Sequence, residues 1–211
     1  RLRLALRIRY VDEDLAIANM EDLSEDDLIT STEDDAYIMT ATDIVDNQND
    51  LYTGLIERGY PHTSHYIGKT MVDIMIGSGD SHNPDDPRLA VYCDTAYAQW
   101  PGRPGYEDVD YFGYRGRPVL GDVPVEEKYP WGFNSASKLS AFWYAPLIER
   151  PMLRSSEVYF ALAEAALFGL KDGDAEALYQ KGIDEALACT QRLYETGQSQ
   201  LPDFLDVYYS Q

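Results

Sequence analysis

Hydrophobic positions recur at helical spacing in the last third of the chain. The segments Pro151–Gly169 and Asp174–Cys189 place apolar residues three or four positions apart, which predicts two helices joined by a short turn. Asp174 is suited to an N-cap, and Pro151 is suited to the first turn of a helix. We therefore expect an antiparallel helical hairpin that begins at Pro151.

The residues of this hairpin differ in size in a regular order. The small ones stand where two helix backbones would approach each other, and the large ones stand where the space between the helices must be filled. The small residues are Ala163, Ala175 and Gly182, and the large ones are Tyr159, Leu162 and Tyr179. This order is that of a tetratricopeptide-like hairpin, although one such pair also suits a plain helical core.

The start of the chain combines two patterns. Arg1–Arg9 alternates arginine with apolar residues, and this period of two favours a strand. Asp12 can cap a helix near Glu13–Leu23, in which Leu15 and Ala18 recur at helical spacing. Further along, the apolar residues of a third segment predict a helix over Ser64–Ile76, ended by Gly77.

The segment from Gly77 to Asn134 has a different composition. It holds seven of the eleven prolines, eight of the fifteen glycines and ten of the twenty-six aromatic residues. So many helix and strand breakers predict a long loop-rich insertion. Long loops on a rigid scaffold commonly present binding groups, so we expect this insertion to carry the ligand site.

Aromatic side chains beside planar polar ones are the binding candidates in this insertion. Sugar rings stack their C–H faces on aromatic rings, while their hydroxyl groups need amide, carboxylate or guanidinium partners. The candidate ligand-binding residues are Tyr97, Trp100, Arg103, Trp131 and Asn134. The alternative is that these rings clamp the loop to the scaffold.

Two further arginines have two interpretations, and a third tryptophan is expected away from the binding surface. Arg115 and Arg117 extend the candidate surface or pair with the acidic residues at positions 107, 108 and 110. Trp143 lies in an apolar stretch, and we expect it in the core.

The chain is strongly acidic, with a net charge of -20 and a pI near 4.3. This argues against nucleic acid as a partner, because binding nucleic acid depends on clustered lysine and arginine. Fifteen acidic residues and no Lys or Arg lie between Tyr10 and Glu57, and we expect them on a solvated surface. Asp46–Asp50 alternates oxygen ligands but lacks the glycine and glutamate of an EF-hand, so no metal site is expected.

Catalytic patterns are weak, and no cofactor is expected. Gly77–His82 brings serine, aspartate and histidine together, but not as a nucleophile elbow between strand and helix. His62 and His65 have no third metal ligand at a suitable spacing. Cys93 and Cys189 are far apart, which favours two separate buried thiols over a disulfide.

Four segments together resemble the SusD/RagB family of nutrient-binding lipoproteins, in the order that the family has them. They are Arg1–Arg9, Asp86–Tyr92, Leu139–Ile148 and Pro151–Ala166. The resemblance implies a helix over Arg1–Arg9, against its period of two. Family members are typically more than twice this long and begin with a lipoprotein signal, so we expect this chain to be an interior or C-terminal part.

The resemblance also implies a fold and a function. The fold would be mostly α, with tetratricopeptide-like hairpins: one SusD-like domain fragment over 1–211, with a helical scaffold at 1–76 and 135–211 and the binding insertion at 77–134. The protein would capture a nutrient, such as a glycan, without chemical change and deliver it to a SusC-like TonB-dependent transporter. It would act at the surface of the outer membrane, held by a lipid anchor outside this chain.

Two alternatives come from other functional classes. A helical-repeat module that recognises a peptide or protein would show the same hairpin. A glycoside hydrolase would use a pair of the 37 carboxylates.

Overall fold

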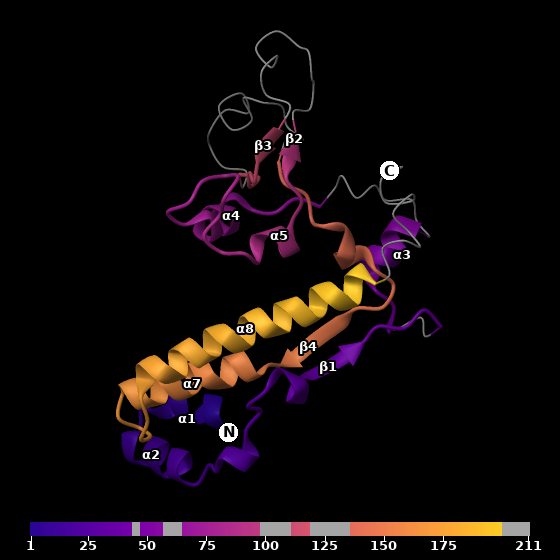
Figure 1. Ribbon diagram of the computed structural model, residues 1–211. Helices are drawn as coiled ribbons and strands as arrows, with labels where there is room; N and C mark the ends of the chain where they lie inside the picture. The colour runs from indigo at the N-terminus through magenta and orange to yellow at the C-terminus, as the bar shows by residue number, and fades with distance from the viewer. Residues whose placement is uncertain (44–46, 57–64, 98–110, 119–135, 200–211) are drawn as a thin grey trace. The chain divides into compact units, whose positions relative to one another are not determined.

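The computed structural model describes residues 1–43, 47–56, 65–97, 111–118 and 136–199 (Figure 1). The chain divides into two compact units. Unit 1 comprises Arg1–Met39 and Glu149–Leu193, and unit 2 comprises Thr40–Ile148 and Tyr194–Gln211. Helices predominate in the described residues, which confirms the mostly α fold class. None of the described helices is both long and apolar enough to cross a membrane.

Unit 1 is built from helices and a two-stranded antiparallel ladder, β1–β4. Its elements are α1 (Leu2–Ile8), α2 (Glu13–Glu21), β1 (Ala36–Met39), β4 (Glu149–Leu153), α7 (Ser155–Leu167) and α8 (Ala175–Gln198), with short 3-10 helices at Glu25–Asp27 and Thr32–Asp34. The last residues of α8, from Tyr194, belong to unit 2.

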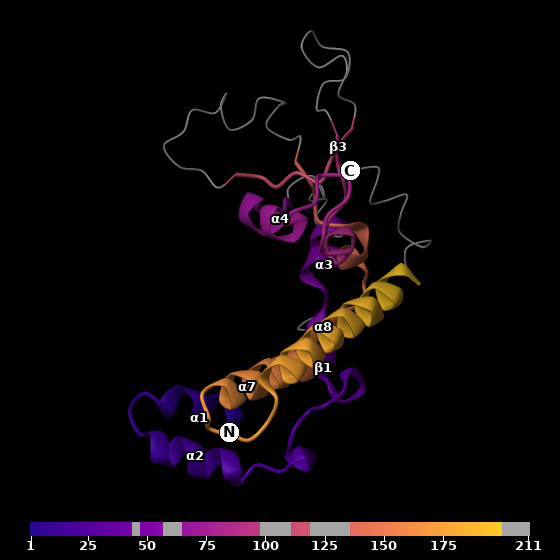
Figure 2. The same ribbon diagram turned by 60° about the vertical axis from the view of Figure 1, so that its left-hand side comes forward.

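The predicted hairpin is formed by α7 and α8, which run side by side (Figures 1 and 2). Asp174 caps α8 as expected, because its Oδ1 accepts hydrogen bonds from the N–H groups of Glu176 and Ala177. Gly169 has φ of 69° in the turn between the helices, a conformation in which glycine meets no Cβ strain. The local signals therefore place the turn and the start of α8.

The predicted start of the first helix is wrong. Pro151 lies in β4, where it pairs with Tyr37 of β1, and α7 begins only at Ser155. Strand pairing with β1, a segment far upstream in the sequence, replaces the helix at Pro151. The residue pattern of the hairpin alone contains no information about this partner. The N–H of Ser155 donates to Oδ1 of Asp35 at 2.6 Å. A carboxylate distant in sequence thus provides the hydrogen-bond acceptor for an N–H group in the first turn of α7, which has no acceptor within the helix.

Most of the predicted packing residues lie inside. Ala163, Tyr159 and Leu162 are buried, and Gly182 is buried so close to Phe160 that a Cβ there would lie 2.7 Å from its ring. The prediction for Tyr179 is wrong, because it is 57% exposed. Its ring contacts that of Phe160, which is itself partly exposed.

The first helices form as the resemblance implied, with α1 in place of the strand that the period of two favours. Asp12 caps α2 through a 2.9 Å hydrogen bond from the N–H of Leu15. The expected face of α2 is wrong, however, because Leu15 is half-exposed while Ala16 and Met20 are buried. Ala16 and Met20 form the face of α2 that packs into the hydrophobic cluster with residues of α1 and α7.

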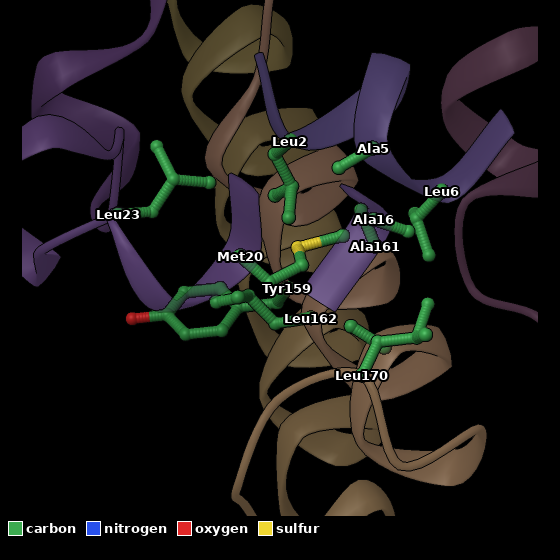
Figure 3. Close-up of a cluster of buried hydrophobic side chains, with 11 residues drawn as sticks. Leu2, Ala5, Leu6, Ala16, Met20, Leu23, Tyr159, Ala161, Leu162 and Leu170 are labelled. Carbon is green, nitrogen blue, oxygen red and sulfur yellow. The ribbon is translucent and has the colours of Figure 1, made fainter. Parts of the chain in front are cut away.

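One hydrophobic cluster forms the core of unit 1 (Figure 3). The labelled side chains come from α1, α2, α7 and the residues that flank them, and they include Leu2, Met20, Tyr159 and Leu170. Beside it, the Lys171 ammonium donates to the carbonyl groups of Met20 and Leu23, each at 3.0 Å. A cation thus caps the C-terminal end of α2, where the helix dipole favours positive charge.

The described acidic side chains between Tyr10 and Glu57 are exposed with one exception. Asp35 is only 6% exposed, so the expectation of a solvated surface is wrong at this residue. Its carboxylate is held by the Ser155 N–H and lies 3.5 Å from the Arg192 guanidinium. Arg192 also pairs with the buried Glu149 at 3.0 Å and donates to the Thr32 carbonyl. Burial is tolerated because the charges are paired and hydrogen-bonded.

Unit 2 contains short elements. They are α3 (Asp50–Ile56), α4 (Lys69–Ile76), α5 (Leu89–Tyr92), β2 (Ala96–Tyr97), β3 (Tyr111–Gly113) and a 3-10 helix over Ala141–Tyr144. The predicted helix over Ser64–Ile76 is confirmed only from Lys69, and Gly77 ends it with φ of 62°. His65–Gly68 is not helical because its backbone groups pair with other segments.

Both cysteines are buried and neither forms a disulfide, as predicted. Cys93 is 1% exposed in unit 2, and Cys189 is 2% exposed in unit 1. Burial raises the pKa of the Cys93 thiol to about 12 and also raises the pKa of Cys189.

Candidate functional site

Three segments of unit 2 meet where the described chain borders residues 57–64, 98–110 and 119–135. The segments are 65–69, 113–117 and 136–140, and we call them together the loop-root cluster. The N–H of Arg117 donates to the Ile67 carbonyl at 2.7 Å, and the N–H of Lys69 donates back to the Arg117 carbonyl at 2.8 Å. On the other side of the same segment, the N–H groups of Ile67 and Leu139 donate to the carbonyls of Ser137 and His65.

Ser137 ties these segments together and is fully buried. Its N–H donates to the Arg115 carbonyl at 2.7 Å, and its hydroxyl accepts from the Arg115 N–H at 3.0 Å. Its carbonyl accepts from Ile67 at 3.1 Å. One small polar residue thus satisfies backbone groups of two other segments, which fixes their register.

Glycine is required at one point of this cluster. Gly116 is buried, and a Cβ there would lie 2.3 Å from the Lys69 Cα and 2.7 Å from its nitrogen. These are backbone atoms that cannot rotate away. Gly68, which forms a parallel bridge with Arg117, has no atom within 4 Å of an added Cβ.

The cluster gathers cations around an aromatic ring. Tyr66 and Lys138 form an antiparallel bridge, and the hydrogen bonds on either side of it make this a non-hydrogen-bonded pair, whose side chains lie close on one face. The Arg117 guanidinium lies 4.5 Å from the centroid of the Tyr66 ring, a cation–π distance. We call Tyr66, Arg117 and Lys138 the cationic face.

Burial shifts the pKa of three side chains in this cluster. Desolvation lowers the pKa of Arg115 and, against the attraction of Asp94, the pKa of Lys138. Burial raises the pKa of Tyr66, and the charge of Arg117 acts the other way. The site therefore holds partly desolvated positive charges in a chain whose net charge is -20.

Aromatic residues support the cluster. The Tyr144 hydroxyl lies 2.8 Å from Nδ1 of His65, and Tyr144 is 1% exposed. Trp143 packs against Phe142 with ring centroids 4.4 Å apart and stacks on Tyr92 with an interplanar angle of 7°. This agrees with the expectation that Trp143 belongs to the core.

The predicted binding residues are mostly beyond what the structure describes. Tyr97 lies in β2, and its backbone pairs with Tyr111 of β3. Trp100, Arg103, Trp131 and Asn134 lie outside the described residues, as does His62. Their role in ligand binding remains a prediction.

The serine, aspartate and histidine of Gly77–His82 form a turn. Oδ1 of Asp80 accepts from the N–H groups of His82 and Asn83 at 2.7 and 3.0 Å. Oγ of Ser81 lies 3.2 Å from Nδ1 of His82, and Oδ1 of Asp80 lies 3.9 Å from the same Nδ1. A triad needs the carboxylate and the nucleophile on opposite nitrogens of the ring, so this arrangement does not match one.

Sequence reasoning did not single out Tyr66, Ser137 or Lys138. Only Arg115 and Arg117 gave a signal, as neighbouring cations in an acidic chain. Among the described residues, no group of three or more His, Cys, Asp or Glu side chains is arranged to hold a metal ion.

A groove in unit 1 is a second candidate surface. It lies along α1 and α7, has a volume of about 430 Å³ and is lined by residues that include Arg3, Arg7, Tyr10, Phe160 and Glu164. Arg3 pairs with Glu157, and Arg9 pairs with Glu164 at 2.8 Å. The lining of the groove thus includes ion-paired side chains and two aromatic rings, Tyr10 and Phe160.

Comparison with known proteins places the chain in a family. It matches the SusD-like family described as "Starch-binding associating with outer membrane" over residues 1–209, and it belongs to that family. This confirms the resemblance seen in the sequence. No protein with a curated description matches the chain.

Solved structures share the fold. A chitin-binding protein matches with 24% identity and a TM-score of 0.66, over 92% of this chain and 39% of its own. A SusD homologue from Bacteroides vulgatus matches with 22% identity and a TM-score of 0.63, over 90% and 34%. A SusD homologue from Parabacteroides distasonis matches with 20% identity and a TM-score of 0.59, over 95% and 41%. The chain thus spans between a third and about two fifths of the length of these proteins.

Proposed function

We propose that the protein to which this chain belongs captures a glycan at the surface of the bacterial outer membrane. The observation that carries this proposal is the family match, which extends over residues 1–209 and whose description names starch binding and the outer membrane. The chitin-binding protein of similar fold supports a saccharide ligand.

The insertion at 77–134 is the proposed binding surface. Its aromatic rings would stack on sugar rings, and its amide and guanidinium groups would pair with sugar hydroxyls. Trp100 and Trp131 are the stacking platforms in this proposal, with Tyr97, Arg103 and Asn134 beside them. The loop-root cluster supports this proposal, because backbone hydrogen bonds that fix these segments reduce the conformational entropy lost when a ligand binds.

The proposed mechanism is capture and delivery without a chemical step. The bound glycan passes to a SusC-like TonB-dependent transporter, and a lipid anchor outside this chain holds the protein at the membrane. No residue acts as an acid, base or nucleophile in this mechanism, and no cofactor takes part.

A glycan panel on the full-length protein tests the function. Trp100→Ala and Trp131→Ala are then compared with the parent by calorimetry, and each should lose about 1–3 kcal/mol of binding free energy, by analogy with other planar stacking. Tyr179→Ala is the matched control, because this ring is exposed in unit 1. If both tryptophan variants fold and bind as the parent does, the site lies elsewhere.

The groove along α1 and α7 favours one alternative, a module that binds a peptide or protein. Absence of any glycan binding, with binding of peptides that Phe160→Ala abolishes, would support it. Product analysis after incubation with the bound glycan tests the third class, a glycoside hydrolase, since capture alone leaves the glycan intact.

A further inference from the structure

The groove along α1 and α7 adjoins a second cavity. The groove has a volume of about 430 Å³, and the cavity, of about 200 Å³, is lined by α1, α7, residues 23–29 and Leu153. Arg3, Glu157 and Ala161 line both hollows, so the two form one continuous depression. We call it the α1–α7 furrow, and all of its lining residues belong to unit 1.

The furrow follows two helices that run in the same direction. Its lining advances from Arg1 to Tyr10 through α1 as it advances from Arg154 to Glu164 along α7. The stretch along α7 is about 15 Å long, or about three helical turns. On α7 the cavity is lined by Arg154, Glu157, Val158 and Ala161, and the groove by Glu157, Phe160, Ala161 and Glu164. The second set is the first shifted by three positions, so the two hollows lie about one turn apart.

The lining of the furrow is mostly apolar. The apolar residues of the cavity are Leu2, Leu23, Leu28, Ile29, Leu153, Val158 and Ala161, and those of the groove are Leu6, Phe160 and Ala161, with the ring of Tyr10. Tyr10 is 80% exposed, and Phe160 is also exposed. Exposed apolar surface that is edged by charged residues marks sites of interaction with other molecules.

The two helices carry opposite charges. The charged residues within α1 are all arginines, and those within α7 are all glutamates. Two ion pairs connect the helices, Arg3 with Glu157 and Arg9 with Glu164. Arg7 lines the groove, is exposed and forms no ion pair with a described residue. The α1 side of the groove therefore has a positive charge that an acidic partner would complement.

A helix suits this furrow better than an extended peptide does. The furrow runs along α1 and α7, whose backbone groups are bonded within the helices, so it offers no strand edge. An extended segment would bury N–H and C=O groups without partners there, whereas a helix satisfies its own. Helices bound in apolar grooves use apolar side chains three or four positions apart, which is the separation of the two hollows.

We propose that the α1–α7 furrow binds an amphipathic α-helix of a protein partner. Apolar side chains one turn apart on that helix enter the cavity and the groove, one in each. Acidic side chains on the flank of the helix next to α1 meet Arg7. The inference is independent of glycan capture, because the furrow belongs to unit 1 and the proposed glycan surface at 77–134 belongs to unit 2.

The first test uses a designed helical peptide that carries a fluorescent label. The peptide has Leu and Phe one turn apart on one face and Glu on one flank. One control peptide has Lys in place of each Glu, and another has Ser in place of Leu and Phe. Fluorescence anisotropy with the full-length protein should show at least tenfold tighter binding of the first peptide than of either control. The preference for Glu over Lys should decrease at high salt.

The second test uses variants of the protein. Phe160→Ala should weaken binding of the acidic peptide at least tenfold, and Arg7→Glu should reverse the preference so that the Lys peptide binds more tightly. Leu167→Ala is the matched control, because Leu167 is 71% exposed on the same helix and does not line the furrow. Equal binding of the three peptides, or a preference that Arg7→Glu leaves unchanged, would overturn the inference.

The third test distinguishes the partner helix from other occupants. Sedimentation equilibrium should show a monomer, and a thiol-specific dye should react quickly with Arg7→Cys and slowly with the parent. A dimer that Phe160→Ala dissociates would overturn the inference in favour of a second copy. A monomer in which Arg7→Cys reacts slowly would overturn it in favour of coverage by another part of the same protein. The glycan panel proposed above is unaffected by these outcomes.

Discussion

Oδ1 of Asp35 accepts a 2.6 Å hydrogen bond from the backbone N–H of Ser155, the first residue of α7. The two residues lie 120 positions apart in sequence. On its other side, the same carboxylate faces Arg192 of α8 at 3.5 Å. The start of the tetratricopeptide-like hairpin is therefore set by a residue that belongs to neither of its helices.

Loss of this carboxylate should destabilise unit 1. Asp35→Ala removes the partner of a buried N–H and a carboxylate that pairs with Arg192, so we expect the free energy of unfolding to fall by about 2–4 kcal/mol. Asp34→Ala is the control, since Asp34 is exposed and should change stability little. Urea unfolding measures both, and equal midpoints for the two variants would contradict the role of Asp35.

Overpacking the hairpin should be costly on its inner face only. Ala163 is 6% exposed in α7, so Ala163→Leu should lower the free energy of unfolding by about 1–3 kcal/mol. Ala188→Leu introduces the same side chain at an exposed position of α8 and should be nearly neutral. Thermal unfolding followed by circular dichroism distinguishes the two, and a stable Ala163→Leu variant would refute close packing at that residue.

Two neighbouring glycines of the loop-root cluster, Gly68 and Gly116, should respond differently to a methyl group. Gly116→Ala drives a Cβ against the backbone of Lys69, so it should lower stability by about 1–3 kcal/mol and weaken glycan binding through the loop-root cluster. Gly68→Ala meets open space at φ of -66° and should retain both stability and affinity. Unfolding and calorimetry on the same samples provide the check. Equal affinities would show that the cluster does not govern the site.

Both thiols should be unreactive in the folded protein at pH 8. Burial raises the pKa of Cys93 to about 12 and raises that of Cys189. A raised thiol pKa means that the protonated, non-nucleophilic form predominates below it. A thiol-specific dye should therefore react slowly with the native protein and quickly with two thiols after denaturation. A fast-reacting thiol in the native state would contradict the burial of that cysteine.

Local chemistry along the sequence determined the helical class and several element ends. Asp12 and Asp174 cap α2 and α8 with their own side chains, and Gly77 ends α4. These outcomes depend on residues within one turn of each other, so a sequence pattern contains the whole cause. The separate burial of the two cysteines also followed from their spacing.

Only the tertiary structure determines the positions at which contacts with distant segments override the local conformational preference of the sequence. Pro151 suits the first turn of a helix, but it lies in β4 because this segment pairs with β1. Asp35 lies in an acidic, polar stretch, yet Ser155 and Arg192 make its burial favourable.

The cationic face arises in the same way. Tyr66, Arg117 and Lys138 come from three segments that backbone hydrogen bonds bring together. No period or spacing in the sequence encodes such a meeting. It results from the pairing of backbone groups that must be satisfied when they are removed from water.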